Sequence, residues 1–219
     1  KTIWTDNDVG DKIILNKSLS DSEEGRYVSS NIFELKNNFQ LNNSSFAVLY
    51  RTNAQSRSIE DALRKINIDY QVFGGLSFYQ RKEIKDVLAY LRLLINPDDE
   101  QAFKRIINFP ARGIGQTTLN KIAVEAKNSS VSDYIFIKDL LKSSEILNNS
   151  TKNKLLDFVI MIESIKNKIE HADVFDITKE VLKQSGLYNL YKNDESLEGI
   201  NRIQNIEELL NGIKDFVEN

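Results

Sequence analysis

The sequence predicts an α/β unit with a parallel sheet, followed by an all-α unit, in a chain that is mostly helical overall. Between residues 12 and 73, short apolar runs that favour β structure alternate with segments of helical periodicity. That alternation is typical of a parallel sheet with crossover helices. After residue 75 only helical periodicity continues, and the pair Gly74-Gly75 separates the two patterns.

The first unit carries three runs of strand length, at residues 12–15, 46–50 and 70–73. The run from Phe46 to Tyr50 is continuously apolar, as expected for a strand covered on both faces. Between the runs we expect two helices. The first begins after Ser20, a favourable N-cap, and extends to about Leu41, and the second covers Ser56 to Ile66.

In the second unit, apolar residues recur at helical spacing. We expect helices over residues 82–95, 99–107, 116–127, 132–142, 151–171, 174–185 and 197–218. Asn96-Pro97 ends the first of these helices and Phe109-Pro110 the second, because a residue before proline disfavours helical backbone.

The composition excludes several classes of function. The chain has no cysteine, which excludes disulfides, thiolate metal sites, iron–sulfur clusters and cysteine nucleophiles. Its one histidine, His171, excludes a histidine-rich metal site and has the surroundings of a surface residue. No apolar run approaches the roughly 20 residues of a membrane helix. We therefore expect a cytoplasmic protein with no membrane partner.

The chain begins at Lys1 and its only methionine is Met161, which indicates a piece of a larger protein. Its net charge of -3 argues against a uniformly basic surface. Residues 46–127 hold 13 Lys or Arg and 9 Asp or Glu, a net +4, whereas residues 128–219 hold 11 and 16, a net -5. The basic middle indicates an anionic partner or an uneven scatter of surface charge.

Common enzyme signatures are absent. The sequence has no G-x-x-x-x-G-K-(S/T) phosphate loop, no G-x-S-x-G elbow and no H-E-x-x-H motif. Asp98-Asp99-Glu100 has the composition of a hard-cation site. The alternative is the acidic first turn of the next helix, where carboxylates meet the helix dipole.

Three segments carry residues suited to nucleic acid. Tyr50 to Arg57 opens a helix after a predicted strand, and its Arg, Asn, Gln and Thr side chains supply donors for phosphate, sugar and base edges. Gly74 to Asp86 places Phe78 and Tyr79 beside Arg81 and Lys82, as a stacking and phosphate surface would. The alternatives are a capped loop for the first segment and core aromatics for the second.

The third segment, from Pro110 to Leu119, joins two predicted helices through Gly113-Ile114-Gly115. Glycines let backbone N–H groups approach a phosphate, and the following helix start adds unpaired donors. Arg112 can add a charge and Thr118 a hydroxyl. Helix-hairpin-helix elements hold a DNA backbone in this way, and the alternative is an ordinary helix–helix turn.

Taken together and in order, these segments resemble the UvrD/PcrA/Rep DNA helicases of superfamily one. The resemblance includes Leu49 to Arg57, Gly74-Gly75 to Leu93 and Asn108 to Thr118. Lys1 to Thr5 and Asn201 to Leu210 are also similar to that family. The match covers essentially the whole chain.

The resemblance implies that residues 1–75 are part of the second RecA-like motor domain and residues 76–219 a helical accessory domain with a helix-hairpin-helix-like turn. Single-stranded DNA would contact Arg51 and Asn53. The duplex backbone would contact Gly113, Gly115 and Thr118, with Arg112 as a helper, and Gly74 and Gly75 would form a hinge. No catalytic or metal-binding residue is expected in this piece.

The resemblance further implies an ATP-dependent DNA helicase that moves 3′ to 5′ and uses ATP and Mg²⁺ bound outside this piece. The expected partners are DNA, without sequence preference, the rest of the helicase chain, and repair or replication proteins. The alternative is a non-catalytic regulatory or partner-binding module with the same fold. Accessibility separates the two, because DNA contacts need exposed side chains.

Overall fold

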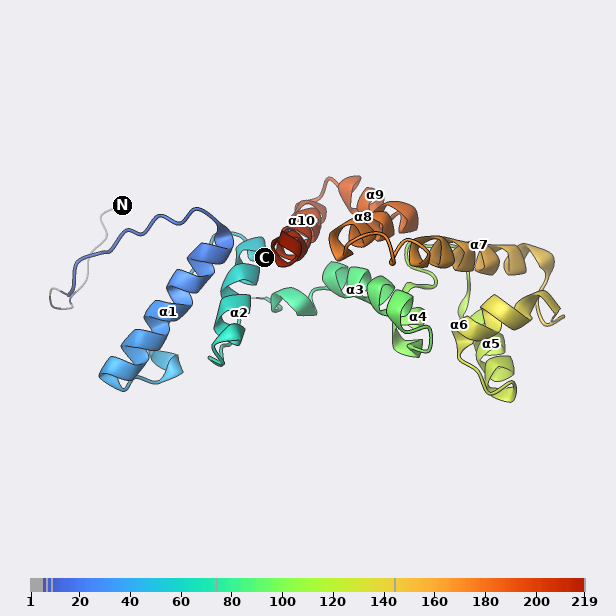
Figure 1. The fold of residues 1–219 in the computed structure, drawn as a ribbon, viewed down its shortest axis with the longest axis horizontal. Helices are drawn as coiled ribbons and strands as arrows, with labels where there is room; N and C mark the ends of the chain where they lie inside the picture. Colours follow the sequence, from blue (N-terminus) through green and yellow to red (C-terminus); the bar gives the residue numbers. More distant parts are fainter. Residues whose placement is uncertain (1–5, 7, 9, 74, 144, 219) are drawn as a thin grey trace. The chain divides into compact units, whose positions relative to one another are not determined.

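The computed structural model describes residues 6, 8, 10–73, 75–143 and 145–218. Over these residues the chain is helical and contains no strand (Figure 1). The predicted parallel sheet of the α/β unit is therefore wrong, whereas the mostly helical character is confirmed. None of the described helices combines the length and apolarity that crossing a membrane requires.

The three runs expected as strands lie in irregular segments, and several of their large side chains are in solvent. Leu49 is 94% exposed and Phe73 is 82% exposed. A strand is held by hydrogen bonds to a neighbouring strand, and within the described residues none of these runs pairs with another. The apolar composition predicts compatibility with a sheet, but it does not supply the partner strand.

The chain divides into two compact units. Unit 1 comprises residues up to 48 together with 58–70, and unit 2 comprises residues 49–57 and 71–219. Unit 1 contains α1 (Asp21–Phe39), η1 (Asn43–Ser45) and most of α2 (Ser56–Lys65). The N-cap of α1 is Ser20, as predicted. Gly25 lets α1 approach α2 closely, because a Cβ at Gly25 would lie 2.4 Å from the carbonyl oxygen of Ser58.

Unit 2 holds the other helices (Figure 1). They are η2 (Asn53–Gln55), η3 (Phe78–Gln80), α3 (Lys82–Ile95), α4 (Glu100–Ile106), α5 (Gln116–Asn128), α6 (Asp133–Ile135), η4 (Phe136–Leu140), η5 (Leu141–Ser143), α7 (Asn149–Lys166), α8 (Val174–Ser185), α9 (Leu187–Lys192) and α10 (Leu197–Glu218). The predicted bounds of α3, α8 and α10 are confirmed, whereas α9 is not among the predicted helices.

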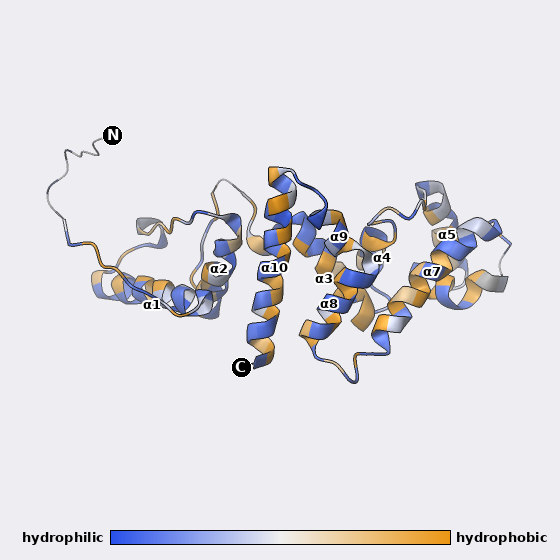
Figure 2. Cartoon of the chain, turned by 90° about the horizontal axis from the view of Figure 1, so that it is seen from above, coloured by the Kyte–Doolittle hydropathy of each residue, from blue (hydrophilic) through white to orange (hydrophobic). Residues whose placement is uncertain are grey.

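Helix α3 is at the centre of unit 2 and contacts α4, α7, α8 and α10. The helices carry distinct apolar and polar faces (Figure 2). Large side chains from three of them are fully buried in one core: Tyr90, Leu93, Phe103, Ile106 and Phe158. This core supports the turn between α4 and α5.

Candidate nucleic-acid interface

The side chain of Asn108 and the buried residue Ile114 fix the conformation of the turn between α4 and α5. Oδ1 of Asn108 accepts hydrogen bonds from the backbone N–H groups of Arg112 (2.8 Å) and Ile114 (3.2 Å). Ile114 is buried in the core. Gly113 has a φ of +70°, a backbone conformation that favours glycine. Gly113 and Gly115 consequently lie on the exposed side of the turn.

The Arg112 side chain is directed into the protein. Its Nη1 donates to three backbone carbonyl oxygens, those of Ile106 (2.9 Å), Ile107 (3.3 Å) and Pro110 (3.2 Å). Its Nη2 donates to the Tyr90 hydroxyl (2.7 Å), and its Cζ lies 5.1 Å from the centroid of the Phe158 ring. The guanidinium therefore ties the turn to the end of α4, and its predicted contact with phosphate stays a prediction.

Lys154, on α7, is a cation at this turn that the sequence did not reveal. A Cβ placed on Gly113 would lie 2.9 Å from Nζ of Lys154. Lys154 is exposed and makes no hydrogen bond or ion pair with the described part of the chain. Its sequence neighbours carry no signal that it lies beside Gly113, because only the packing of α7 brings the two together.

The start of α5 lacks a side-chain cap. Gly115 is its N-cap and provides no side chain, and the first turn contains no acidic residue. Five helices begin at capping side chains: Ser20 for α1, Asp99 for α4, Ser132 for α6, Asn148 for α7 and Asp173 for α8. Helices α3 and α9 begin, like α5, without one. Half-buried Thr118 lies in this first turn. The exposed N–H groups and the helix dipole at α5 suit an anion.

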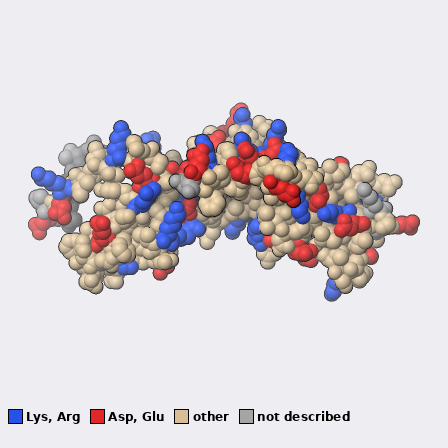
Figure 3. Space-filling model, in the orientation of Figure 1, with Lys and Arg blue, Asp and Glu red and all other residues tan. Residues whose placement is uncertain are grey.

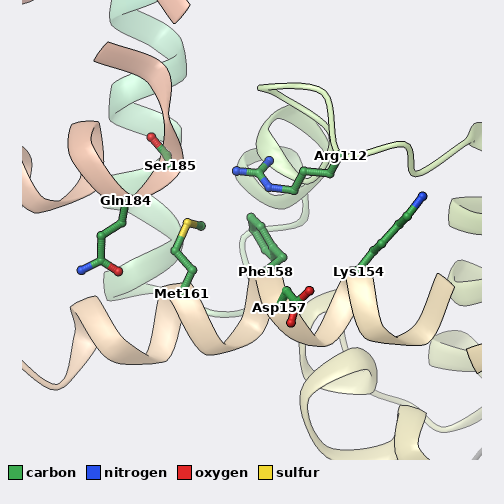
Figure 4. A pocket seen from close by; sticks show the side chains of 7 residues that line it. All are labelled: Arg112, Lys154, Asp157, Phe158, Met161, Gln184 and Ser185. Carbon is green, nitrogen blue, oxygen red and sulfur yellow. The ribbon is translucent and has the colours of Figure 1, made fainter. Parts of the chain in front are cut away.

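A groove of 390 Å³ opens beside the turn, between α7, α8 and the turn itself (Figure 4). Arg112 reaches from the turn to a position over Phe158, and Lys154 rises from α7 beside it (Figure 4). The groove is lined by Arg112, Lys154, Asp157, Phe158, Met161, Gln184 and Ser185. This mixture of cations, a carboxylate and apolar groups matches no single class of ligand.

The second candidate segment forms a tight turn around Gln55. The Oε1 atom of Gln55 accepts hydrogen bonds from the backbone N–H groups of Arg51 and Thr52, both at 3.0 Å. The side chains of Arg51 and Asn53 are exposed, as DNA contacts require, and have no partner within the described residues. Their predicted contact with single-stranded DNA stays a prediction.

The segment after the glycine pair favours the alternative of core aromatics. Phe78 is fully buried and meets Tyr79 in an edge-to-face arrangement at 5.2 Å between ring centroids. Arg81 is also buried. An exposed stacking surface is therefore not formed here. Gly75 is exposed, and Gly74 lies outside the described residues, so the hinge stays a prediction. Residues 1–5 also lie outside the described residues.

The acidic run at residues 98–100 belongs to a helix start. Asp99 is the N-cap of α4, and its Oδ1 accepts a hydrogen bond from the N–H of Ala102 at 2.9 Å. This geometry matches the alternative of an acidic first turn. Within the described residues, no group of three or more His, Cys, Asp or Glu side chains is placed to hold a metal ion.

Charges of both signs are interspersed over the helices of unit 2 on the face drawn in Figure 3. That face carries no continuous basic stripe. On this face, contacts with a phosphate backbone would therefore be local instead of following a broad electrostatic track.

Comparison with known proteins gives the family. The chain belongs to the UvrD-like helicase C-terminal domain family, whose model matches residues 1–219. This finding confirms the resemblance to UvrD- and PcrA-type helicases.

Individual relatives agree with this family. The chain is 40% identical over 218 residues to a protein named ATP-dependent DNA helicase PcrA from Bacillus subtilis (strain 168), a match covering 99% of this chain and 29% of that protein. It is 37% identical over 216 residues to PcrA of Leuconostoc citreum, covering 99% and 29%. It is also 37% identical over 216 residues to a probable DNA helicase II homolog of Rickettsia felis, covering 99% and 33%. The chain thus spans a third or less of these relatives.

Proposed function

We propose that this chain is the DNA-contacting part of an ATP-dependent DNA helicase that moves 3′ to 5′ and unwinds duplex DNA. The family and the names of the relatives support this proposal. Residues 1–75 would belong to the second motor domain and residues 76–219 to the accessory domain. In the bacteria that hold these relatives, chromosomal DNA lies in the cytoplasm, and we place the helicase there.

ATP and Mg²⁺ would be bound by other parts of the helicase. The sequence contains no phosphate-binding loop, and the described residues offer no group of carboxylates placed for a metal ion. We therefore expect no ATP turnover by residues 1–219 alone, and robust turnover by the pure chain would contradict the assignment. The partners would be DNA, the rest of the helicase, and repair or replication proteins.

The observation that carries the DNA-binding role is the uncapped start of α5. Gly113 and Gly115 leave its N–H groups accessible, and no carboxylate competes for them. Thr118 adds a hydroxyl and Lys154 a charge. These groups suit a phosphate of the duplex backbone, because they recognise charge and geometry without reading bases. Arg51 and Asn53 would contact the single strand.

The second candidate is a regulatory or partner-binding module with the same fold. Its support is the net charge of -3 and the acidic stretch 128–219, with 11 basic and 16 acidic residues. Such a module would keep the helices and lack affinity for DNA.

Fluorescence anisotropy of a tailed DNA duplex, measured over a series of salt concentrations, separates the two candidates. We expect weak, sequence-independent binding that falls as salt rises, because phosphate contacts release counterions. Lys154→Ala should lower the slope of log K against log salt by about 1. Thr118→Ala should weaken binding with an unchanged slope, since it removes no charge.

Lys127→Ala is the matched control, because Lys127 lies in the last turn of α5, at the far end from the proposed site. It should leave both affinity and slope close to those of the wild type. Equal effects of Lys154→Ala and Lys127→Ala would contradict a local phosphate contact. Absence of binding at low salt, also in the complete helicase, would favour the regulatory module.

A further inference from the structure

A buried polar cluster joins η2 to helices α3 and α10. Nη1 of Arg81 donates to the carbonyl oxygen of Asn53 and to Oδ1 of Asn205, both at 2.8 Å. Nη2 of Arg81 donates to Oγ of Ser56 at 2.9 Å. Nδ2 of Asn205 donates to Oε1 of Glu83 at 2.6 Å. We call Arg81, Ser56, Glu83 and Asn205 the Arg81 cluster.

The Arg81 cluster is buried, and its hydrogen bonds fix the orientation of each member. None of the four residues is more than 6% exposed. A buried charge is tolerated where it is hydrogen-bonded and balanced. The Asn205 amide links the two charges, because its oxygen accepts from Arg81 while its nitrogen donates to Glu83. The Arg81 guanidinium also lies 5.2 Å from the centroid of the Phe78 ring.

A second contact ties the same segment to α10. Nε of Arg57 lies 2.7 Å from Oε1 of Glu208, and both side chains are largely buried. Gly212 leaves room for this guanidinium, since a Cβ there would lie 2.5 Å from Nη1 of Arg57. Asn205, Glu208 and Gly212 follow one another at intervals of three and four residues. These residues lie on one face of α10. Glu208 on that face bonds to Arg57 directly, whereas Asn205 is linked to Asn53 only through Arg81.

The held segment is the turn that presents the proposed single-strand contacts. Arg81 grips it through the Asn53 carbonyl, while the side chains of Arg51 and Asn53 remain exposed. A short turn without such an anchor would sample many conformations, and binding DNA would have to order it.

We propose that Arg81 is a positioning residue for single-stranded DNA. It fixes the backbone at Asn53, so that the turn carrying Arg51 and Asn53 is ordered before the strand binds. This inference rests on the proposed function, since it assigns the turn to the single strand. Arg81 itself is buried and does not touch DNA. Its contribution is to order the turn, and its hydrogen bond to Asn205 connects the turn to α10.

The test measures oligo-dT binding by the chain, with Arg81→Lys and Ser56→Ala as variants. Lysine keeps the charge but cannot reach the same acceptors in a planar fork. Ser56→Ala spares the guanidinium and removes a hydroxyl that accepts from Arg81 and itself donates to the Asn53 carbonyl oxygen at 3.0 Å. We expect Arg81→Lys to weaken single-strand binding about tenfold and Ser56→Ala to weaken it less. Neither should change the salt slope, because no phosphate contact is lost.

Two controls separate positioning from a general loss of folding. Arg92→Lys makes the same substitution at an exposed arginine of α3, the helix whose N-cap residue is Arg81, and it should leave single-strand binding unchanged. Binding of a blunt duplex by each variant reports the distant turn between α4 and α5. A purely structural role for Arg81 would weaken duplex and single-strand binding together, and that result would overturn the proposal.

Hydrogen exchange gives a readout that does not depend on DNA. Amides of residues 51–55 should exchange faster in Arg81→Lys and Ser56→Ala, whereas those of α4 and α7 should keep their protection. Unchanged exchange at 51–55 in both variants would overturn the positioning role. If Arg51→Ala leaves single-strand binding and its salt slope unaltered, the proposed function of the turn fails instead, whatever the exchange data show.

Discussion

The Tyr90 hydroxyl lies between the Arg112 guanidinium and the Phe109 carbonyl. It accepts a hydrogen bond from Nη2 of Arg112 and donates one to the Phe109 oxygen, both at 2.7 Å. Burial raises the pKa of Tyr90, although the neighbouring Arg112 opposes that effect. The hydroxyl thus keeps its proton and donates. The turn that carries Gly113 is built on a buried side chain of α3.

Replacing Tyr90 with Phe tests this support. Tyr90 is fully buried, so Tyr90→Phe leaves the Phe109 carbonyl without its donor and Arg112 without one acceptor. We expect the free energy of unfolding to fall by about 1–3 kcal/mol, as for a buried hydrogen bond broken on one side. Urea unfolding followed by circular dichroism measures the change. Tyr188→Phe, at a half-buried ring on α9, should change stability far less, and equal losses would contradict the role of Tyr90.

Gly25→Ala probes the packing of α1 on α2. The added Cβ would lie 2.4 Å from the Ser58 carbonyl oxygen and 2.8 Å from its carbon, so backbone must move. Overpacking of this kind costs about 1–3 kcal/mol. Hydrogen exchange of α1 amides should accelerate about tenfold or more. Ser30→Ala, at an exposed position of α1, serves as the control, and unchanged protection in Gly25→Ala would show that the helices have room to separate.

Asp99 should make α4 sensitive to acid. The hydrogen bond from the Ala102 N–H lowers the pKa of this carboxyl, partial burial opposes the shift, and Arg92 lowers the pKa further. Because the folded pKa lies below the unfolded value of about 3.9, the stabilisation is complete above that value. It is lost as the pH falls through the folded pKa.

Asp99→Asn isolates this contribution, since asparagine also caps helices but does not titrate. Between about pH 5 and pH 2, wild-type stability should fall more steeply than that of the variant. Other carboxylates titrate equally in both proteins and cancel in the difference. If the free energy of unfolding, measured with urea, depends on pH in the same way in both proteins, the charge of Asp99 does not stabilise the fold.

The helices of unit 2 could be predicted where their signals are local. The bounds of α3 follow from apolar spacing and from Asn96-Pro97, and those of α8 follow from apolar spacing alone. The short helix α9 carries too few turns to show a period. The prediction of a sheet was wrong because strand pairing is not local. It depends on a partner strand that the composition of one segment does not reveal.

The contacts of the side chains at the candidate site could be predicted only in part from the sequence. The turn at Gly113 and Gly115 could be predicted from the position of the two glycines between two helical patterns, and the structure exposes both. The inward direction of Arg112 and the approach of Lys154 depend on packing between α3, α4 and α7. Such relations join residues far apart in the chain, and no local pattern encodes them.

The Arg81 cluster also constrains how this sequence can diverge. Losing Arg81 alone would leave Oδ1 of Asn205 and Oγ of Ser56 without the donor they share, and losing Asn205 alone would remove the hydrogen bond from its amide to the buried Glu83 carboxylate. Arg57 and Glu208 form a second pair with the same mutual dependence. Amino-acid substitutions at these positions should therefore be correlated, so that related sequences keep each set or replace all of its members. The residues of each buried set should therefore be conserved together or replaced together.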